Sequence, residues 1–256
     1  MDFHPHSARI LLVGAGPGAA DLLTLRAVRA LAAADVVVHD GLVGDEVMAL
    51  IPAHARRISV AKRRARHTLA QDEIGDLLIA EARAGNTVVR LKGGDPFIFG
   101  RGGEEVDAAL AAGVPVHVVP GISAANGAAA STLMPLTHRD HASMVSFVAG
   151  ECRGLAEQNW AGLAGKGRTL VIYMGLAGAA PIAEKLMADG LAPDTPVAVI
   201  ERATQVNERL VTSLLADLAG LVEREAIASP ALIIVGDVAA LPAARAKLKE
   251  TTCLVC

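Results

Sequence analysis

Strand-like and helix-like segments alternate along the first half of this chain, and this alternation is the strongest constraint on its fold. The strand-like segments are short and rich in Val, Ile and Leu, whereas the helical ones place apolar residues three or four positions apart. Strands are predicted at 8–14, 35–40, 56–61, 86–96 and 115–121, and helices at 21–33, 71–85 and 104–113. Since strands that alternate with helices pair in parallel, we expect an α/β fold whose largely parallel sheet carries helices on its faces.

The polar segment 135–143 interrupts this pattern, which resumes after it. A chain of 256 residues is long enough to bury two sizeable cores. We therefore expect two α/β lobes, 1–137 with the glycine loops and catalytic residues, and 138–256. The further strands are predicted at 143–150, 168–175, 196–201 and 231–237, and a helix at 180–190.

Composition and charge exclude several classes of protein. Hydrophobic residues make up 52% of the chain, yet no segment supplies about 18 consecutive apolar residues, so no membrane span is expected. Residues 1–10 lack the apolar core of an export signal. Three cysteines, Cys152, Cys253 and Cys256, form no disulfide framework, which favours a reduced cytoplasm. The net charge of −3 offers no basic field for nucleic acid, and no metal-ligand spacing is present.

A glycine loop lies between strand and helix in LLVGAGPGAADLLTL, residues 11–25. From Gly14 to Ala19 it fits the spacing G-x-G-x-x-G/A, and Asp40 ends the next predicted strand, where a ribose-binding acid belongs. An NAD(P)-dependent oxidoreductase is therefore one interpretation, and a tight turn that needs glycine only for its backbone is another. Pro17 counts against NAD, because it lacks the N–H that could serve a phosphate.

A second glycine loop, within VVRLKGGDPFIFGRGGEE at 88–105, is not explained by a dinucleotide fold. Gly93 and Gly94 let the main chain approach a ligand closely. Asp95 adds a carboxylate at the carboxyl edge of a parallel strand, where α/β sheets bind ligands. Two glycine loops, one acid and few positive charges favour a cationic, adenosine-bearing ligand over a pyrophosphate. The alternative is a turn capped by the aspartate.

Six segments of the chain resemble uroporphyrinogen-III C-methyltransferases: VGAGPGAADLLTLRAVRAL, VVRLKGGDPFIFGRGGEE, VVPGISAA, PLTHRD, TLVIYMG and SPALIIVGDV. They occur in this order along nearly the whole chain. The resemblance implies the tetrapyrrole methylase fold, two αβα lobes with a ligand cleft between them, rather than a Rossmann dehydrogenase. It also implies a homodimer that moves methyl groups from S-adenosyl-L-methionine (SAM) to C2 and C7 of uroporphyrinogen III. The products are then S-adenosyl-L-homocysteine (SAH) and precorrin-2, a precursor of sirohaem, cobalamin and haem d1.

The resemblance further implies roles for residues at matching positions. Asp40 is expected to accept a proton and Lys62 to donate one. Arg101 and Glu104 complete the expected catalytic set, near the substrate. The cofactor contacts implied are Pro17, Gly93, Gly94, Asp95, Ile98, Ser123, Ala124, Met174 and Ala203.

A cluster of Lys and Arg residues follows the third predicted strand and fits a substrate rimmed with carboxylates. A cation about 4 Å from a carboxylate gains about 4 kcal/mol at an effective dielectric constant near 20, before desolvation. We expect Lys62, Arg63 and Arg101 to bind the substrate. Arg56 and Arg57 are expected to face away from it. The alternative is a solvated face, on which such charges contribute about 0–1 kcal/mol.

Several positions depart from the family's usual residues. His39 and Gly41 replace Tyr and Arg, which removes a positive charge from the substrate side. Ala203 replaces a glycine that contacts SAM, and Glu151 stands where a histidine is usual. These changes leave the SAM site largely intact and concentrate on the substrate side.

Three other functions are alternatives. A related precorrin methyltransferase would act on a later intermediate, although GRGGEE and PLTHRD favour uroporphyrinogen III. An NAD(P)-dependent oxidoreductase rests on the first loop and Asp40 alone. A binding protein without catalysis is suggested by Gly41 and Ala203. Since the sequence carries no N-terminal dehydrogenase–ferrochelatase module, we expect its chemistry to stop at methylation.

Overall fold

The computed structural model describes residues 9–61, 70–150 and 159–243. The chain divides into two compact units, Met1–Ala124 and Ala125–Cys256. Some residues singled out in the sequence lie outside the described ranges, so their predicted roles stay predictions. They are Lys62, Arg63, Glu151 and the three cysteines.

The division between the units lies earlier than the sequence places it, between Ala124 and Ala125 rather than after residue 137. Helix α5 (Ala124–Ser131) therefore belongs almost entirely to the second unit. There the N–H of Ala125 donates a hydrogen bond to the Tyr173 hydroxyl at 3.1 Å. This helix is not predicted from the sequence, because a run of alanines has no amphipathic pattern.

The first unit contains a five-stranded sheet in the order β3-β2-β4-β1-β5, in which every neighbouring pair is parallel. The predicted α/β class and parallel pairing are confirmed for this unit. The strands are β1 (Arg9–Gly14), β2 (Val36–His39), β3 (Arg56–Ser59), β4 (Thr87–Lys92) and β5 (Val116–Val119). The helical elements are η1 (Ala20–Leu22), α1 (Leu25–Ala32), α2 (Asp45–Ala49), α3 (Gln71–Arg83) and α4 (Gly102–Ala111).

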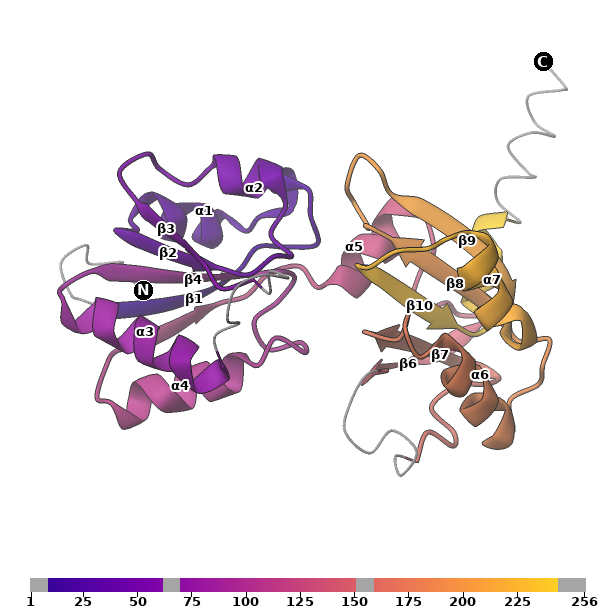
Figure 1. Ribbon diagram of the computed structural model, residues 1–256. Helices are drawn as coiled ribbons and strands as arrows, with labels where there is room; N and C mark the ends of the chain where they lie inside the picture. Colours follow the sequence, from indigo (N-terminus) through magenta and orange to yellow (C-terminus); the bar gives the residue numbers. More distant parts are fainter. Residues whose placement is uncertain (1–8, 62–69, 151–158, 244–256) are drawn as a thin grey trace, which may run out of the picture. The chain divides into compact units, whose positions relative to one another are not determined.

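Helices cover both faces of this sheet, α1 and α2 on one face and α3 and α4 on the other (Figure 1). The strands explain the layering, because successive side chains of a strand point to opposite faces. Leu11 and Val13 of β1 lie in the core with α1 and α2. Ile10 and Leu12 lie in the core with α3 and α4. All four side chains are fully buried, as expected for a parallel sheet covered on both faces.

Helix α1 is shorter than the predicted 21–33. Its N-cap is Thr24, whose side-chain oxygen accepts a hydrogen bond from the Ala27 N–H at 3.1 Å. This cap satisfies one of the free N–H groups at the helix start and fixes where the helix begins. The residues before it form η1, a single 3-10 turn.

The second unit contains another five-stranded sheet, in the order β6-β7-β10-β8-β9. Only the β6/β7 pair is parallel there, and the other three neighbouring pairs are antiparallel. The predicted parallel pairing therefore holds throughout the first sheet but only for β6 and β7 in the second. Strands β8 and β9 are antiparallel because they follow each other with no helix between them. The strands are β6 (Ala142–Ala149), β7 (Gly167–Tyr173), β8 (Pro196–Glu201), β9 (Arg209–Leu214) and β10 (Ala231–Val235), and the further helices are α6 (Ala179–Ala188) and α7 (Leu218–Arg224).

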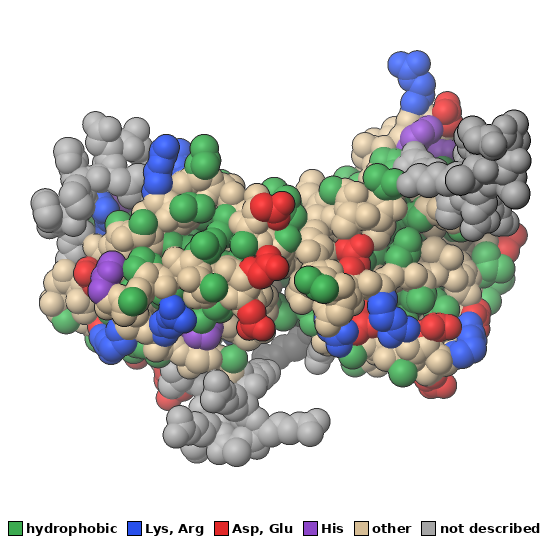
Figure 2. Space-filling model, turned by 90° about the horizontal axis from the view of Figure 1, so that it is seen from above, with side chains coloured by type: hydrophobic (Ala, Val, Ile, Leu, Met, Phe, Trp, Pro, Cys, Tyr) green, Lys and Arg blue, Asp and Glu red, His purple; other side chains and the backbone are tan. Residues whose placement is uncertain are grey.

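Helices α6 and α7 pack on one face of this second sheet (Figure 1). Ile182 and Leu186 of α6 and Leu221 of α7 share one buried cluster with alternate residues of β7, β8 and β10. On the second unit, as drawn in Figure 2, Lys and Arg side chains lie among Asp and Glu.

Glycines at three strand ends bring the loops after β1, β4 and β5 into backbone contact. A Cβ on Gly121 would lie 2.2 Å from the carbonyl oxygen of Gly94 and 2.8 Å from the Cα of Gly14. A Cβ on Gly14 would in turn lie 2.5 Å from the Cα of Gly121. Non-bonded carbon atoms favour separations of about 3.5–4.0 Å, so only glycine fits at these two positions.

We expect Gly121→Ala to lower the free energy of unfolding by about 1–3 kcal/mol, the usual effect of overpacking a tight site. Urea denaturation followed by circular dichroism measures this difference. Gly103→Ala in α4 is the matched control, because a Cβ there meets nothing within 4 Å. Alanine inside a helix is neutral or stabilising. Equal stability of Gly121→Ala and the unaltered chain would contradict the backbone contact.

Candidate functional site

The two glycine loops predicted from the sequence are joined to each other at the carboxyl edge of the first sheet. The N–H of Ala15 donates to the Lys92 carbonyl at 2.7 Å. Gly16 donates to the Gly94 carbonyl at 3.1 Å, and Gly94 donates to the Gly16 carbonyl at 2.7 Å. The loops after β1 and β4 thus form one surface made of main chain, at the edge where parallel sheets bind ligands.

The strand order contradicts the dinucleotide interpretation of the first loop. In a dinucleotide-binding fold the first two strands are neighbours, so the acid that ends the second strand lies beside the first loop. Here β4 lies between β1 and β2. The Asp40 carboxylate accepts hydrogen bonds from the N–H of Leu42 at 2.9 Å and of Gly93 at 3.4 Å. Asp40 therefore serves the second glycine loop and not the first.

Asp95 links the second loop to the loop after β5. Its Oδ1 accepts a hydrogen bond from the Phe97 N–H at 2.9 Å, and its Oδ2 accepts one from the Gly121 N–H at 2.9 Å. Each carboxylate oxygen has a further lone pair that a ligand donor can use. Asp95 therefore holds two loops together, and its predicted contact with a cofactor stays a prediction.

The other predicted cofactor contacts of the first unit lie on the same loops. Pro17 and Ile98 are half-buried, Ser123 is buried, and Ala124 begins α5. Gly94 has a φ of 68°, in the left-handed region that favours glycine, and a Cβ on it would lie 3.7 Å from the Ala124 nitrogen. The structure thus places these residues on the neighbouring loops that follow β1, β4 and β5.

Arg101 and Glu104 form an exposed ion pair at the start of α4. The Arg101 Nε lies 3.0 Å from the Glu104 Oε1, and the two side chains are 57% and 54% exposed. The hydrogen bond between them lowers the pKa of the Glu104 carboxyl and raises the pKa of the Arg101 guanidinium, and it is the largest cause of both shifts. Both charges face solvent, where a ligand carboxylate can reach Arg101.

A buried ion cluster beside β4 is missed by the interpretation of the sequence. Glu105 of α4, whose side chain is fully buried, lies 2.9 Å from the Arg90 Nε and 2.9 Å from the Lys92 Nζ. Gln71 of α3 donates to the Glu105 Oε1 at 3.2 Å. Burial lowers the pKa of Lys92 and the Arg90 charge adds to this, while Glu105 and Asp40 oppose it. The sequence signal is two cations at alternate positions of an otherwise apolar strand, which puts both on one face.

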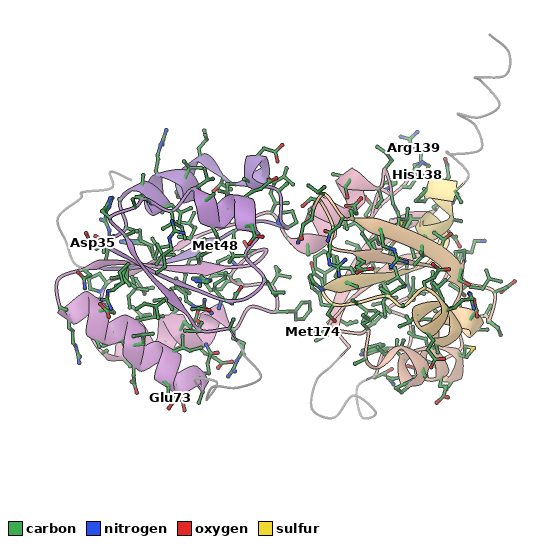
Figure 3. All side chains as sticks on the ribbon, turned by 45° about the horizontal axis from the view of Figure 1, so that its top comes forward. Asp35, Met48, Glu73, His138, Arg139 and Met174 are labelled. Carbon is green, nitrogen blue, oxygen red and sulfur yellow. The ribbon has the colours of Figure 1, made fainter. Side chains whose placement is uncertain are left out.

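Two predicted cofactor contacts belong to the second unit. Met174 follows β7 with a φ of 53° and is 47% exposed (Figure 3). Ala203 is 8% exposed and lies between Arg202 and Thr204, whose φ angles are 49° and 66°. Ala203 itself is outside the left-handed region, so alanine in place of the family's glycine causes no backbone strain. Both residues stay predicted contacts.

Arg56 and Arg57, which we expect to face away from the substrate, have partners within the first unit. Arg56 pairs with Glu81 of α3. Arg57 donates to the Ile51 carbonyl at 2.9 Å. Both guanidinium groups therefore have partners in the first unit itself.

The histidines at 138 and 141 contact each other, with ring centroids 4.8 Å apart; Figure 3 labels His138. Within residues 9–61, 70–150 and 159–243, no three His, Cys, Asp or Glu side chains are grouped as a metal site requires.

In the same part of the chain no helix has both the length and the apolar character needed to cross a bilayer.

We expect Asp95→Ala to lower the free energy of unfolding by about 1–3 kcal/mol, because two N–H groups lose their acceptor. Asp95→Asn keeps one acceptor oxygen, so its loss should be smaller. Denaturant unfolding measures both variants. Asp107→Ala, at an exposed position of α4, is the control and should stay within about 0.5 kcal/mol. If Asp95→Ala were no less stable than this control, the carboxylate would not hold the loops together.

Comparisons with known proteins agree with one another. Residues 9–219 match the family model described as Tetrapyrrole (Corrin/Porphyrin) Methylases. The chain is 51% identical over 232 residues to a siroheme synthase of Edwardsiella ictaluri and 52% identical over 233 residues to one of Tolumonas auensis. Each alignment covers 91% of this chain but 50% and 49% of those proteins. The chain thus spans about half the length of the curated relatives it matches.

Solved structures give the same result for the fold. A uroporphyrin-III C-methyl transferase from Thermus thermophilus, complexed with S-adenyl homocysteine, matches with a TM-score of 0.77 and 41% identity. This match covers 91% of this chain and 99% of that one. A cobalt precorrin-4 methyltransferase matches with a TM-score of 0.80 and 26% identity, covering 91% and 96% of the two chains. The predicted fold is confirmed.

Proposed function

The chain belongs to the tetrapyrrole (corrin/porphyrin) methylase family, and we propose that it is a SAM-dependent C-methyltransferase that converts uroporphyrinogen III to precorrin-2. One observation carries this proposal: two glycine loops, joined by backbone hydrogen bonds and tied down by Asp95, line the carboxyl edge of a parallel sheet. The Thermus thermophilus relative, solved with S-adenyl homocysteine, supports SAM as the methyl donor.

The second loop suits a ligand that lies close to main chain. A Cβ on Gly93 would come within 2.7 Å of the Leu42 Cβ, so glycine is required there for packing, whereas a Cβ on Gly94 would have only the Ala124 nitrogen near it, at 3.7 Å. The carboxylates of Asp40 and Asp95 flank the same loop. Negative charge at this edge favours a cationic sulfonium and disfavours a pyrophosphate.

Alignment is the main task of the protein in this reaction. When bound, SAM supplies an electrophilic methyl group on a positively charged sulfur, and neutral SAH remains once the carbon–sulfur bond is broken. The electron pair of a pyrrole carbon forms the new carbon–carbon bond, and C2 and C7 are methylated in two turnovers. Holding both reactants in line can contribute roughly 7–11 kcal/mol.

Side chains then handle charge and protons. Asp40 accepts the proton that the methylated macrocycle releases, and Lys62 acts as proton donor. Arg63 and Arg101 bind the acetate and propionate carboxylates of the substrate rim, and Glu104 orients Arg101 through their ion pair. The cofactor contacts expected in the second unit, Met174 and Ala203, are part of the same proposal, as are a cytoplasmic location and a homodimer.

A methyltransferase acting on a later precorrin is the second candidate within the family. The match to a cobalt precorrin-4 methyltransferase at 26% identity keeps it open. The higher identity of 41% to a uroporphyrin-III C-methyl transferase favours the first candidate. An oxidoreductase has no support, because the strand order separates Asp40 from the first glycine loop.

We expect two labelled methyl groups on the tetrapyrrole after anaerobic incubation of the protein with uroporphyrinogen III and methyl-labelled SAM. Mass analysis of the extracted tetrapyrrole is the measurement. Binding of SAM without transfer would contradict the proposed substrate and favour a later precorrin or a non-catalytic role.

We expect Asp40→Asn to lower kcat by about 10²–10⁴-fold, the usual contribution of a general base. Asparagine keeps an oxygen for the Leu42 N–H and loses only the longer bond from the Gly93 N–H at 3.4 Å, so the affinity for SAH should change little. Steady-state methylation and calorimetric SAH titration measure the two effects separately. The control is Asp76→Asn, at an exposed position of α3. Unchanged turnover in Asp40→Asn would remove Asp40 from the catalytic set.

A further inference from the structure

We propose that Lys92 and Glu105 are positioning residues for the tetrapyrrole side of the site. Their buried ion pair supports the loop at 96–102, which carries Arg101 into α4. This inference rests on the proposed function, because it assigns the loop to substrate binding. Neither residue is predicted from the sequence to have a functional role.

The side chain of Lys92 lies directly beneath this loop. Arg90 and Lys92 are two positions apart on β4, so both point to the face that α3 and α4 cover. A Cβ on Gly100 would lie 3.2 Å from the Lys92 Cε and 2.7 Å from the Pro96 carbonyl oxygen. The absence of a side chain at Gly100 therefore lets the loop rest on the lysine stem, whose ammonium group continues to Glu105 at 2.9 Å.

The loop itself has a conformation that its surroundings must maintain. Phe99 and Arg101 have φ angles of 52° and 56°, which are unfavourable for residues other than glycine. The Asp95 carboxylate accepts the Phe97 N–H at 2.9 Å, and the Pro96 carbonyl accepts the Gly102 N–H at 3.1 Å. Such strained segments persist when the structure around them fixes them. Lys92 below the loop and Glu105 in the first turn of α4 add to these hydrogen bonds from the other side of the loop.

The main-chain surface formed by the loops after β1 and β4 does not depend on the Lys92 side chain. Gly94 is held by two backbone hydrogen bonds to Gly16, and the main-chain carbonyl of Lys92 accepts the Ala15 N–H. Loss of the Lys92 charge also leaves Glu105 paired with Arg90 at 2.9 Å, so the core keeps a compensated carboxylate. The effect of removing the charge should therefore fall mainly on the tetrapyrrole side, because Ile98 is the one proposed cofactor contact on the supported loop.

The test is Lys92→Met, which keeps the apolar stem and removes the charge. We expect kcat/KM for uroporphyrinogen III to fall by about 10- to 100-fold, as for reactants misplaced by about 1 Å. The SAH dissociation constant should stay within about threefold, and Lys92→Arg should recover part of the lost activity. The control is Lys185→Met, which breaks a partly buried pair with Asp189 at 3.2 Å in α6 of the second unit and should leave catalysis unchanged.

Hydrogen exchange gives a readout independent of activity. The Gly102 N–H, bonded to the Pro96 carbonyl at 3.1 Å, should exchange faster in Lys92→Met than in the unaltered chain. If that variant does not fold, Glu105→Gln is measured in the same way. If the unaltered chain binds SAH but never methylates uroporphyrinogen III, the proposed function is wrong. The exchange rate of the Gly102 N–H would still show whether Lys92 supports the loop. Unchanged exchange and kinetics, or equal losses for SAH and tetrapyrrole, would overturn the inference.

Discussion

The site depends on backbone-to-backbone contact among the loops that follow β1, β4 and β5. The Gly94 carbonyl packs against Gly121 and accepts the N–H of Gly16 at 3.1 Å. A single Cβ at the crossing would force the loops apart, and Asp95 could no longer reach the Gly121 N–H. The main-chain surface and the place of the Asp95 carboxylate follow from this close approach.

The first sheet could be predicted because each of its strands is a short apolar run in the sequence, and amphipathic helices separate these runs. The loops could be predicted because glycine next to an acid at a strand end marks a close approach. The contact of Asp95 with Gly121 could not, since it joins residues 26 positions apart through a strand order that no local pattern encodes. The ion pair of Lys92 with Glu105 could not be predicted either, because it also joins residues that are distant in the sequence. In the second unit, β9 follows β8 without a helix, so helix–strand alternation does not reveal the antiparallel pairing.

The proposed SAM side and the proposed tetrapyrrole side of the site differ in whether main chain or side chains form them. This difference bears on the positions at which the chain departs from the family's usual residues. The proposed SAM side is mostly main chain, and Ala203 causes no backbone strain there. The proposed tetrapyrrole side consists of side chains, so each substitution there changes its chemistry. At Gly41 the arginine of the family is absent, and a Cβ would lie 3.1 Å from the Ala61 Cβ. The proposed function therefore leaves Lys62, Arg63 and Arg101 to bind the substrate carboxylates without it.

The central claim is that a loop with dinucleotide-like spacing belongs to a SAM site. The most direct measurement is a pair of calorimetric titrations of the same protein, one with SAH and one with NAD⁺. Saturable binding of SAH, with no heat of binding from NAD⁺ at the same concentrations, is the predicted result. Binding of NAD⁺ as tight as that of SAH, or no binding of SAH, would contradict the claim.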